Sequence, residues 1–148
     1  MSSDPDQIVT LARAWVGTPY AHQASVKGVG TDCLGLIRGI WRELYGEEPE
    51  AVPGYTKDWS EPSRDEVLWR AARRHMQEKA RVRPEPGDVV LFRMREGSVA
   101  KHLGVVTPHE YGLGFVHAYD GFGVLENALT RPWRRRIVSC FEFPGGAV

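Results

Sequence analysis

The hydrophobic pattern of this 148-residue chain changes its period once, near Pro86-Gly87-Asp88. Before this point, apolar residues recur every three or four positions, which is typical of amphipathic helices. After it, short β-rich runs alternate with turn sequences, which is typical of a strand meander. Helices followed by consecutive strands predict an α+β domain with a mostly antiparallel sheet of about five strands. We therefore expect a single domain over residues 1–148, with a helical part at 1–80 and a sheet part at 86–144.

Two of the three predicted helices lie at the ends of the helical part. The first is expected to begin after Asp4, which can cap it, and to end near Gly17. Its inward face is expected to be formed by Ile8, Leu11, Ala12, Trp15 and Val16. The third helix is predicted within residues 63–79, where Ser63 and Glu66 have the spacing of a capping box.

The second predicted helix begins at Thr31 or Asp32 and ends before Gly46. The face of this helix that is expected to point inward is apolar and consists of Leu36, Ile37, Ile40, Trp41 and Leu44. The face that is expected to point outward carries Arg38, Arg42 and Glu43. Gly35 and Gly39 are four residues apart, and glycine lowers the stability of a helix. We therefore expect these two glycines to be present because they permit close backbone packing.

Cys33 lies in the first turn of this second helix. Because backbone N–H groups at a helix start favour an anion, we expect a depressed thiol pKa and a nucleophile near neutral pH. Asp32 acts in the opposite direction, since a neighbouring carboxylate raises a thiol pKa; its more natural roles are capping the helix or holding a substrate amine. The alternative for Cys33 is a buried, inert cysteine, which is what we expect of Cys140 on the last strand.

A nucleophilic cysteine needs a base, and the base needs an orienting partner. Two histidines, His102 and His117, lie on neighbouring predicted strands. If these strands pair, the alternation of side chains can place the two rings side by side. A zinc site made of the same two histidines and Cys33 is a competing interpretation, although no CxxC or HxxxH spacing supports it.

Composition excludes several classes of function. Nineteen basic residues balance nineteen acidic ones, so no net charge favours nucleic acid or a membrane surface. No stretch approaches the roughly 18 apolar residues of a membrane span. Two cysteines make no disulfide framework, and the N-terminus lacks the features of a secretory signal peptide, so a reduced cytosolic origin is expected. The basic run Arg131–Arg136 is expected to be a solvated edge of the sheet, with an acidic partner or a wall phosphate as the alternative.

Four motifs, in order along the chain, resemble those of the NlpC-type cell-wall cysteine peptidases, a papain-like family. Together they extend roughly from Ala12 to Val124. They are the block with Pro19-Tyr20 and "DCLGL", the strand start "RPEPGDVVLFR", the strand "KHLGVV", and the strand "FVHAYDGFGV".

The resemblance implies a catalytic set and a substrate. It makes Cys33 the nucleophile, His102 the general base and His117 the polar residue that orients the base. It implies a cysteine peptidase without cofactor or metal that cuts peptidoglycan stem peptides between D-γ-glutamate and the diamino acid. The alternatives are a catalytically silent structural module, a zinc-dependent amidase, and a lipid or acyl transferase on the same scaffold.

The resemblance also implies substrate-binding residues and a setting. Tyr20 matches a tyrosine that helps bind substrate and the oxyanion, with Gln23 as a rival donor, and Asp32 matches an aspartate near the N-terminal end of the substrate. Leu34 after the cysteine and the segment Ala21-His22-Gln23 depart from the common pattern and resemble the subgroup from phage tails and gene transfer agents. We therefore expect a protein made in a bacterial cytoplasm and built into the tail tip of a phage-like particle, where baseplate hub proteins are its partners.

Overall fold

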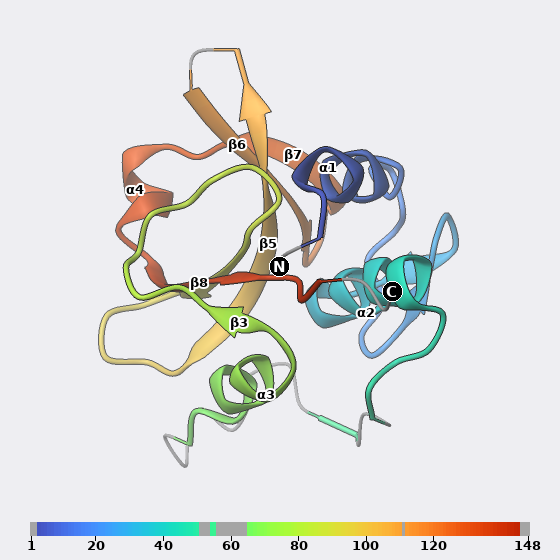
Figure 1. Cartoon of the computed structure of the whole chain (residues 1–148), viewed down its shortest axis with the longest axis horizontal. Helices are drawn as coiled ribbons and strands as arrows, with labels where there is room; N and C mark the ends of the chain where they lie inside the picture. Colours follow the sequence, from blue (N-terminus) through green and yellow to red (C-terminus); the bar gives the residue numbers. More distant parts are fainter. Residues whose placement is uncertain (1–2, 51–53, 56–64, 111, 146–148) are drawn as a thin grey trace.

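The computed structural model describes residues 3–50, 54–55, 65–110 and 112–145. A six-stranded sheet is packed against helices on one broad face, and a short helix covers part of the other face (Figure 1). The helices are α1 (Pro5–Arg13), α2 (Cys33–Tyr45), α3 (Val67–His75) and α4 (Arg131–Arg134). The strands of the sheet are β3 (Gln77–Glu78), β4 (Val89–Arg93), β5 (Ala100–His109), β6 (Gly112–Tyr119), β7 (Gly123–Ala128) and β8 (Ile137–Glu142). A separate hairpin is formed by β1 (Ser25–Val26) and β2 (Gly30–Thr31).

The large sheet has the strand order β3-β8-β4-β5-β6-β7, and each neighbouring pair is antiparallel. The predicted α+β class with a mostly antiparallel sheet is therefore confirmed, with six strands in place of about five. The sixth is β3, which pairs with the C-terminal strand through Gln77 and Glu78. These two residues were expected to continue the third helix, so that expectation is wrong: the helix ends at His75. Ser63, half of the predicted capping box, lies outside the described residues.

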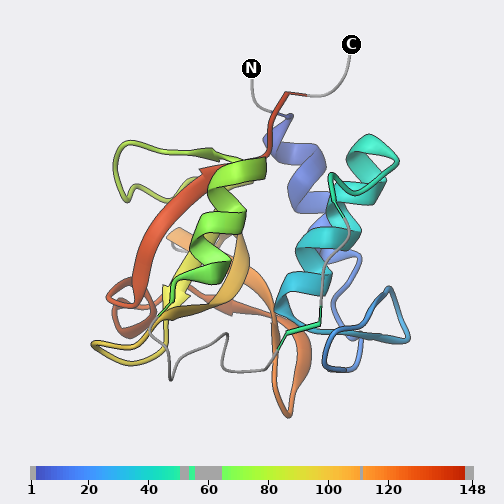
Figure 2. The ribbon, with the colours of Figure 1, turned by 90° about the horizontal axis from the view of Figure 1, so that it is seen from below.

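Alternation along the central strands produces two apolar cores. Val89 and Leu91 of β4 point into the larger core, beneath α1, α2 and α3, whereas Val90 and Phe92 point into a smaller one. Figure 2 shows α1 and α2 side by side, on one side of the sheet. The smaller core is covered by the segment after β7, through Leu129 and Trp133. No described helix is long and apolar enough to cross a bilayer.

Helix α2 has the boundaries that its sequence predicts. The Asp32 side chain caps its start by accepting the Gly35 N–H at 2.7 Å, and Gly46 ends it with φ of 89°. A Cβ on Gly35 would lie 1.9 Å from the carbonyl oxygen of Ala24, and one on Gly39 would lie 2.0 Å from the Trp15 ring, so the predicted close packing is confirmed at both glycines. Val16 was expected to face inward from the first helix; it is 47% exposed because α1 ends three residues earlier, at Arg13.

Candidate active site

Cys33 is the first residue of α2, and its side chain is 7% exposed. Its Sγ donates a hydrogen bond to the backbone carbonyl of Lys101 on β5, at 3.7 Å. The thiol lies in a cleft of about 240 Å³ where the start of α2 meets the central strands. The cleft is lined by Tyr20, His22, Asp32, Cys33, Tyr55, Met94, Lys101, His102, Ala118, Tyr119 and Asp120. The structure therefore brings the predicted nucleophile, base, tyrosine and aspartate to one place.

The two histidines predicted to interact are hydrogen-bonded to each other. Nε2 of His102 on β5 lies 2.7 Å from Nδ1 of His117 on β6. On the far side of the second ring, Nε2 of His117 lies 2.7 Å from Oδ1 of Asn127 on β7. Three adjacent strands thus supply a line of polar groups that begins in the cleft and leads away from Cys33. In the described part of the chain, Nδ1 of His102 takes part in no hydrogen bond, so this nitrogen is the one available for chemistry.

An aromatic cluster surrounds the histidine pair. The ring of Phe115 stacks on His117 with centroids 4.1 Å apart. Trp133 of α4 lies 5.9 Å from His102 and 5.3 Å from His117, between ring centroids. This tryptophan belongs to the basic run that was expected to be a solvated edge of the sheet. Its arginines at 131, 134 and 135 are exposed, as the expectation of a solvated edge requires. The expectation fails for Trp133, because the run contains the short helix α4 and the indole of this helix packs against the site.

Burial determines the protonation of the site. It lowers the pKa of His102 to about 3, with the neighbouring His117 as the second cause. It lowers the pKa of His117 to about 4, although the hydrogen bond to Asn127 acts in the other direction. Burial, reinforced by the Asp32 carboxylate, raises the pKa of the Cys33 thiol to about 12. The predicted depressed thiol pKa is therefore wrong for the resting protein, because desolvation outweighs the backbone N–H groups.

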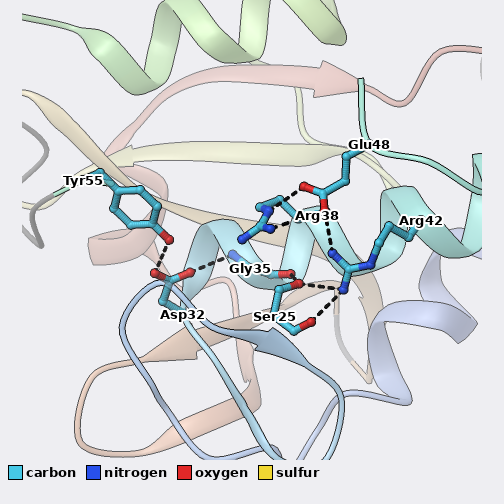
Figure 3. Close-up of polar contacts among 7 residues, drawn as sticks. All are labelled: Ser25, Asp32, Gly35, Arg38, Arg42, Glu48 and Tyr55. Atoms are coloured by element: carbon cyan, nitrogen blue, oxygen red, sulfur yellow. Dashed lines mark hydrogen bonds and ion pairs between the residues drawn. The ribbon is translucent and has the colours of Figure 1, made fainter. Parts of the chain in front are cut away.

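Asp32 is engaged by groups of its own chain (Figure 3). Its Oδ1 accepts the Gly35 N–H, and its Oδ2 accepts both the backbone N–H of Gln23, at 2.7 Å, and the hydroxyl of Tyr55. The Gln23 side chain does not line the cleft; it donates from Nε2 to the Tyr55 carbonyl at 2.6 Å. Tyr20 does line it, held by a bridge to Thr31, two residues before the cysteine. The structure thus places Tyr20, and not Gln23, beside the thiol.

A network of ion pairs fastens the surrounding loops to α2 (Figure 3). Arg38 and Arg42 both donate to the carboxylate of Glu48, at 2.6 Å and 3.0 Å. Arg42 also donates to the backbone carbonyl of Ser25 at 2.7 Å, and the Ser25 hydroxyl donates to the carbonyl of Gly35. The two arginines were expected to face outward; they are half-buried and hold the segments before and after the helix in place.

The described residues contain no group of three histidine, cysteine, aspartate or glutamate side chains that could hold a metal ion. The ring nitrogens through which His102 and His117 could share a metal are instead joined by a direct hydrogen bond. Among the described residues, there is therefore no set of ligands that supports the zinc interpretation.

Several residues at the site were not singled out as site residues by sequence reasoning, among them His22, Tyr55, Trp133 and Asn127. His22 and Tyr55 are joined by a hydrogen bond from the ring to the Tyr55 carbonyl at 2.9 Å. For Asn127 a signal existed, because a tight turn at Asp120-Gly121 sets the register of β6 against β7. In that register Asn127 pairs with Phe115, and Leu125 pairs with His117. Asn127 lies two residues beyond Leu125, on the same face of the sheet.

Comparison with solved structures finds the same fold in NlpC/P60 proteins, at low sequence identity. A lipoprotein-like NLP/P60 family protein from Staphylococcus aureus subsp. aureus Mu50 matches with a TM-score of 0.59 and 19% identity over 97% of this chain. The NlpC/p60 domain of the peptidoglycan hydrolase SagA matches with a TM-score of 0.63 and 16% identity over 95% of this chain. Ly7917, in a complex with the hydrolysing product of MDP, matches with a TM-score of 0.60 and 16% identity over 97%.

The share of each similar protein that this chain covers differs from one match to the next. The chain spans 43% of the Staphylococcus protein, 64% of Ly7917 and 99% of the SagA domain. No model of a known protein family matches the sequence, and no curated protein matches it either. The likeness therefore establishes an NlpC-type, papain-like fold.

Proposed function

We propose that this protein is a peptidoglycan hydrolase that cuts stem peptides by cysteine-peptidase chemistry. The observation that carries the proposal is the cleft in which a thiol at a helix start meets a buried, hydrogen-bonded pair of histidines. The fold supports the substrate class, because the similar SagA domain comes from a peptidoglycan hydrolase and Ly7917 was crystallised with the hydrolysing product of MDP. The resemblance of the sequence motifs favours the bond between D-γ-glutamate and the diamino acid.

The proposed reaction begins from neutral partners. Nδ1 of His102 accepts the thiol proton while Sγ of Cys33 attacks the carbonyl carbon of the amide, which agrees with a high thiol pKa and a low histidine pKa at rest. The carbonyl oxygen becomes negative, and the backbone N–H of Cys33 and the hydroxyl of Tyr20 are the proposed donors to it. His102 then protonates the leaving amine, and a thioester forms.

The second half of the reaction restores the enzyme. A water molecule gives a proton to Nδ1 of His102 and attacks the thioester carbon, which releases the carboxylic acid. The proton on His102 returns to the Cys33 sulfur as the thioester bond breaks. In both halves His117 holds the ring of His102 through their shared hydrogen bond.

Digestion of purified peptidoglycan, with the fragments identified by mass spectrometry, tests this proposal and identifies the bond. Cys33→Ala is expected to abolish fragment release and leave the fold intact, whereas Cys140→Ala, the matched control, keeps activity because Cys140 is buried in the smaller core. His102→Ala should be nearly as severe as Cys33→Ala, and His117→Ala milder. Activity that survives Cys33→Ala rejects the thiol mechanism. Loss of activity with a chelator would favour a zinc amidase, and no activity on any wall would favour a silent structural module.

For its setting, we propose that the protein is carried in the tail tip of a phage-like particle and opens the wall of a recipient cell locally. The support is the resemblance of "DCLGL" and "PYAHQ" to the phage-tail and gene transfer agent subgroup. Mass spectrometry and electron microscopy of purified particles test it. Absence of the protein from particles, with free protein in lysing host cells, would reject delivery and favour a role in lysis.

A further inference from the structure

Asn127 stands at the end of the line of polar groups that begins in the cleft. Its Oδ1 lies 2.7 Å from Nε2 of His117, whose side chain has no exposed surface. Among the described residues, Asn127 is the one hydrogen-bond partner of that nitrogen. Asn127 itself is exposed on β7 and touches neither Cys33 nor the cleft. Any effect it has on chemistry must therefore pass through the two rings.

The hydrogen bonds in this line determine where the protons lie. A carbonyl oxygen can only accept, so Nε2 of His117 must carry a proton and donate it to Oδ1 of Asn127. A neutral imidazole carries one proton, so Nδ1 of His117 is an acceptor, and Nε2 of His102 must be the donor to it. The one proton of neutral His102 is then on Nε2, which leaves a lone pair on Nδ1.

The reverse orientation of the Asn127 amide would exchange donor and acceptor in each of these hydrogen bonds. If Asn127 presented its NH₂ group, Nε2 of His117 would accept, Nδ1 of His117 would donate, and Nε2 of His102 would accept. The proton of neutral His102 would then lie on Nδ1, which is the nitrogen that has to accept the thiol proton. One amide oxygen on β7 thus decides whether His102 can act as a base.

We propose that Asn127 is a positioning residue that fixes the tautomers of both histidines, so that Nδ1 of His102 is unprotonated toward Cys33. The proposal rests on the proposed cysteine-peptidase function for its catalytic consequence. The tautomers themselves follow from the two hydrogen bonds together with the orientation of the Asn127 amide, whose Oδ1 faces His117, and they can be measured in a protein that has no activity.

Nitrogen NMR of protein labelled with ¹⁵N-histidine tests the tautomers directly, because protonated and unprotonated ring nitrogens have different chemical shifts. We expect both His102 and His117 to carry the proton on Nε2 at neutral pH. In Asn127→Leu, the acceptor is gone and the two rings should populate a mixture of tautomers. Ala128→Leu, an apolar substitution at the next exposed position of β7, is the matched control and should leave the spectrum unchanged.

Hydrolysis kinetics on the same variants test the consequence. Asn127→Leu should lower kcat about tenfold with KM unchanged, the effect expected from loss of one partly buried hydrogen bond. Asn127→Asp supplies an acceptor that cannot donate when ionised, so it should retain the tautomers and restore most of kcat. Its carboxylate favours the imidazolium form, so the acidic limb of its pH–rate profile should move to higher pH. Among the described residues, the Tyr119 ring packs against both histidines. The other titratable groups that line the cleft with His102 are unchanged in these variants: Tyr20, His22, Asp32, Cys33, Tyr55, Lys101 and Asp120.

The outcomes separate the two proposals. Protons on Nδ1 in the wild type, or unchanged tautomers and kcat in Asn127→Leu, would overturn the role of Asn127 and leave the peptidase proposal standing. A wild type without thiol-dependent hydrolysis, but with both protons on Nε2, would reject the proposed function and retain the assignment of the tautomers.

Discussion

The hydroxyl of Tyr55 donates a hydrogen bond to Oδ2 of Asp32, the residue immediately before Cys33. Tyr55 reaches this position from a segment after α2, and its backbone carbonyl is held by the side chains of His22 and Gln23. Its phenol therefore occupies a lone pair of the carboxylate that the motif resemblance assigns to the N-terminal end of the substrate. Burial and the neighbouring Asp32 raise the pKa of Tyr55, so the hydroxyl stays protonated and remains a donor.

Tyr55→Phe should improve binding of substrates that carry a free N-terminal amine. It removes one donor from Asp32, and an ammonium group can then replace it in a charge-assisted hydrogen bond. We expect KM for such a peptide to fall several-fold, with kcat little changed. The matched comparison is the same peptide with its amine acetylated, for which KM should stay constant. An equal fall for both peptides would show that Tyr55 acts by bulk and not through Asp32.

Asp32→Asn should make the Cys33 thiol easier to ionise. The Asp32 carboxylate is a cause of the raised pKa of Cys33, and asparagine retains a capping oxygen for α2. The pH dependence of iodoacetamide labelling should therefore shift to lower pH in this variant, relative to the wild type. Labelling of Cys140, whose pKa is also raised by burial, serves as the internal reference. An unchanged profile for Cys33 would mean that burial alone sets its reactivity.

Trp133→Leu should raise the pKa of both His102 and His117. The indole packs against both rings, and burial is the main cause of their low pKa values, so water admitted by a smaller side chain favours the imidazolium. NMR titration of His102 and His117 should show both pKa values moving toward the ordinary value of about 6.5. Trp69→Leu is the control, since Trp69 lies on α3 and donates to Glu78, away from the cleft. Unchanged titration in Trp133→Leu would indicate that Phe115 and the strands alone exclude water.

Local patterns were sufficient for the features of the site that lie close together in the sequence. The Asp32 cap and the Gly46 stop are properties of single turns, so the bounds of α2 and the position of Cys33 could be predicted. The neighbouring positions of His102 and His117 follow from alternation along two strands joined by a short connection.

Long-range contacts explain what sequence reasoning missed. The third helix stops at His75 because the next residues pair with β8, more than sixty positions away, and this pairing overrides their helical propensity. Tyr55 reaches Asp32 from a different loop, and no periodicity marks such a contact. The depressed pKa of Cys33 was predicted from its place at the helix start, against the opposing effect of Asp32, but burial, which depends on the packing of the whole cleft, outweighs that position.

The buried histidine pair should make the protein lose stability as the pH falls below about 6.5. The pKa values of about 3 for His102 and about 4 for His117 lie below the ordinary value, so the unfolded chain binds protons in a range where the folded chain does not. Their contribution to stability is therefore fully present above about pH 6.5 and is lost as the pH falls toward the folded pKa values. Near pH 5.5 few carboxylates titrate, so this range isolates the histidines, and about two protons should be taken up by them on unfolding.

Urea unfolding at several pH values measures this proton uptake from the slope of the free energy of unfolding against pH. His117→Gln should reduce the uptake near pH 5.5 by about one proton relative to the wild type, because one buried titratable ring is removed. His75→Gln is the control, since His75 is paired with the exposed Glu50 on the surface and has no part in the buried pair. Equal slopes in the wild type and His117→Gln would contradict a neutral, buried His117, and with it the uncharged resting state from which the proposed reaction begins.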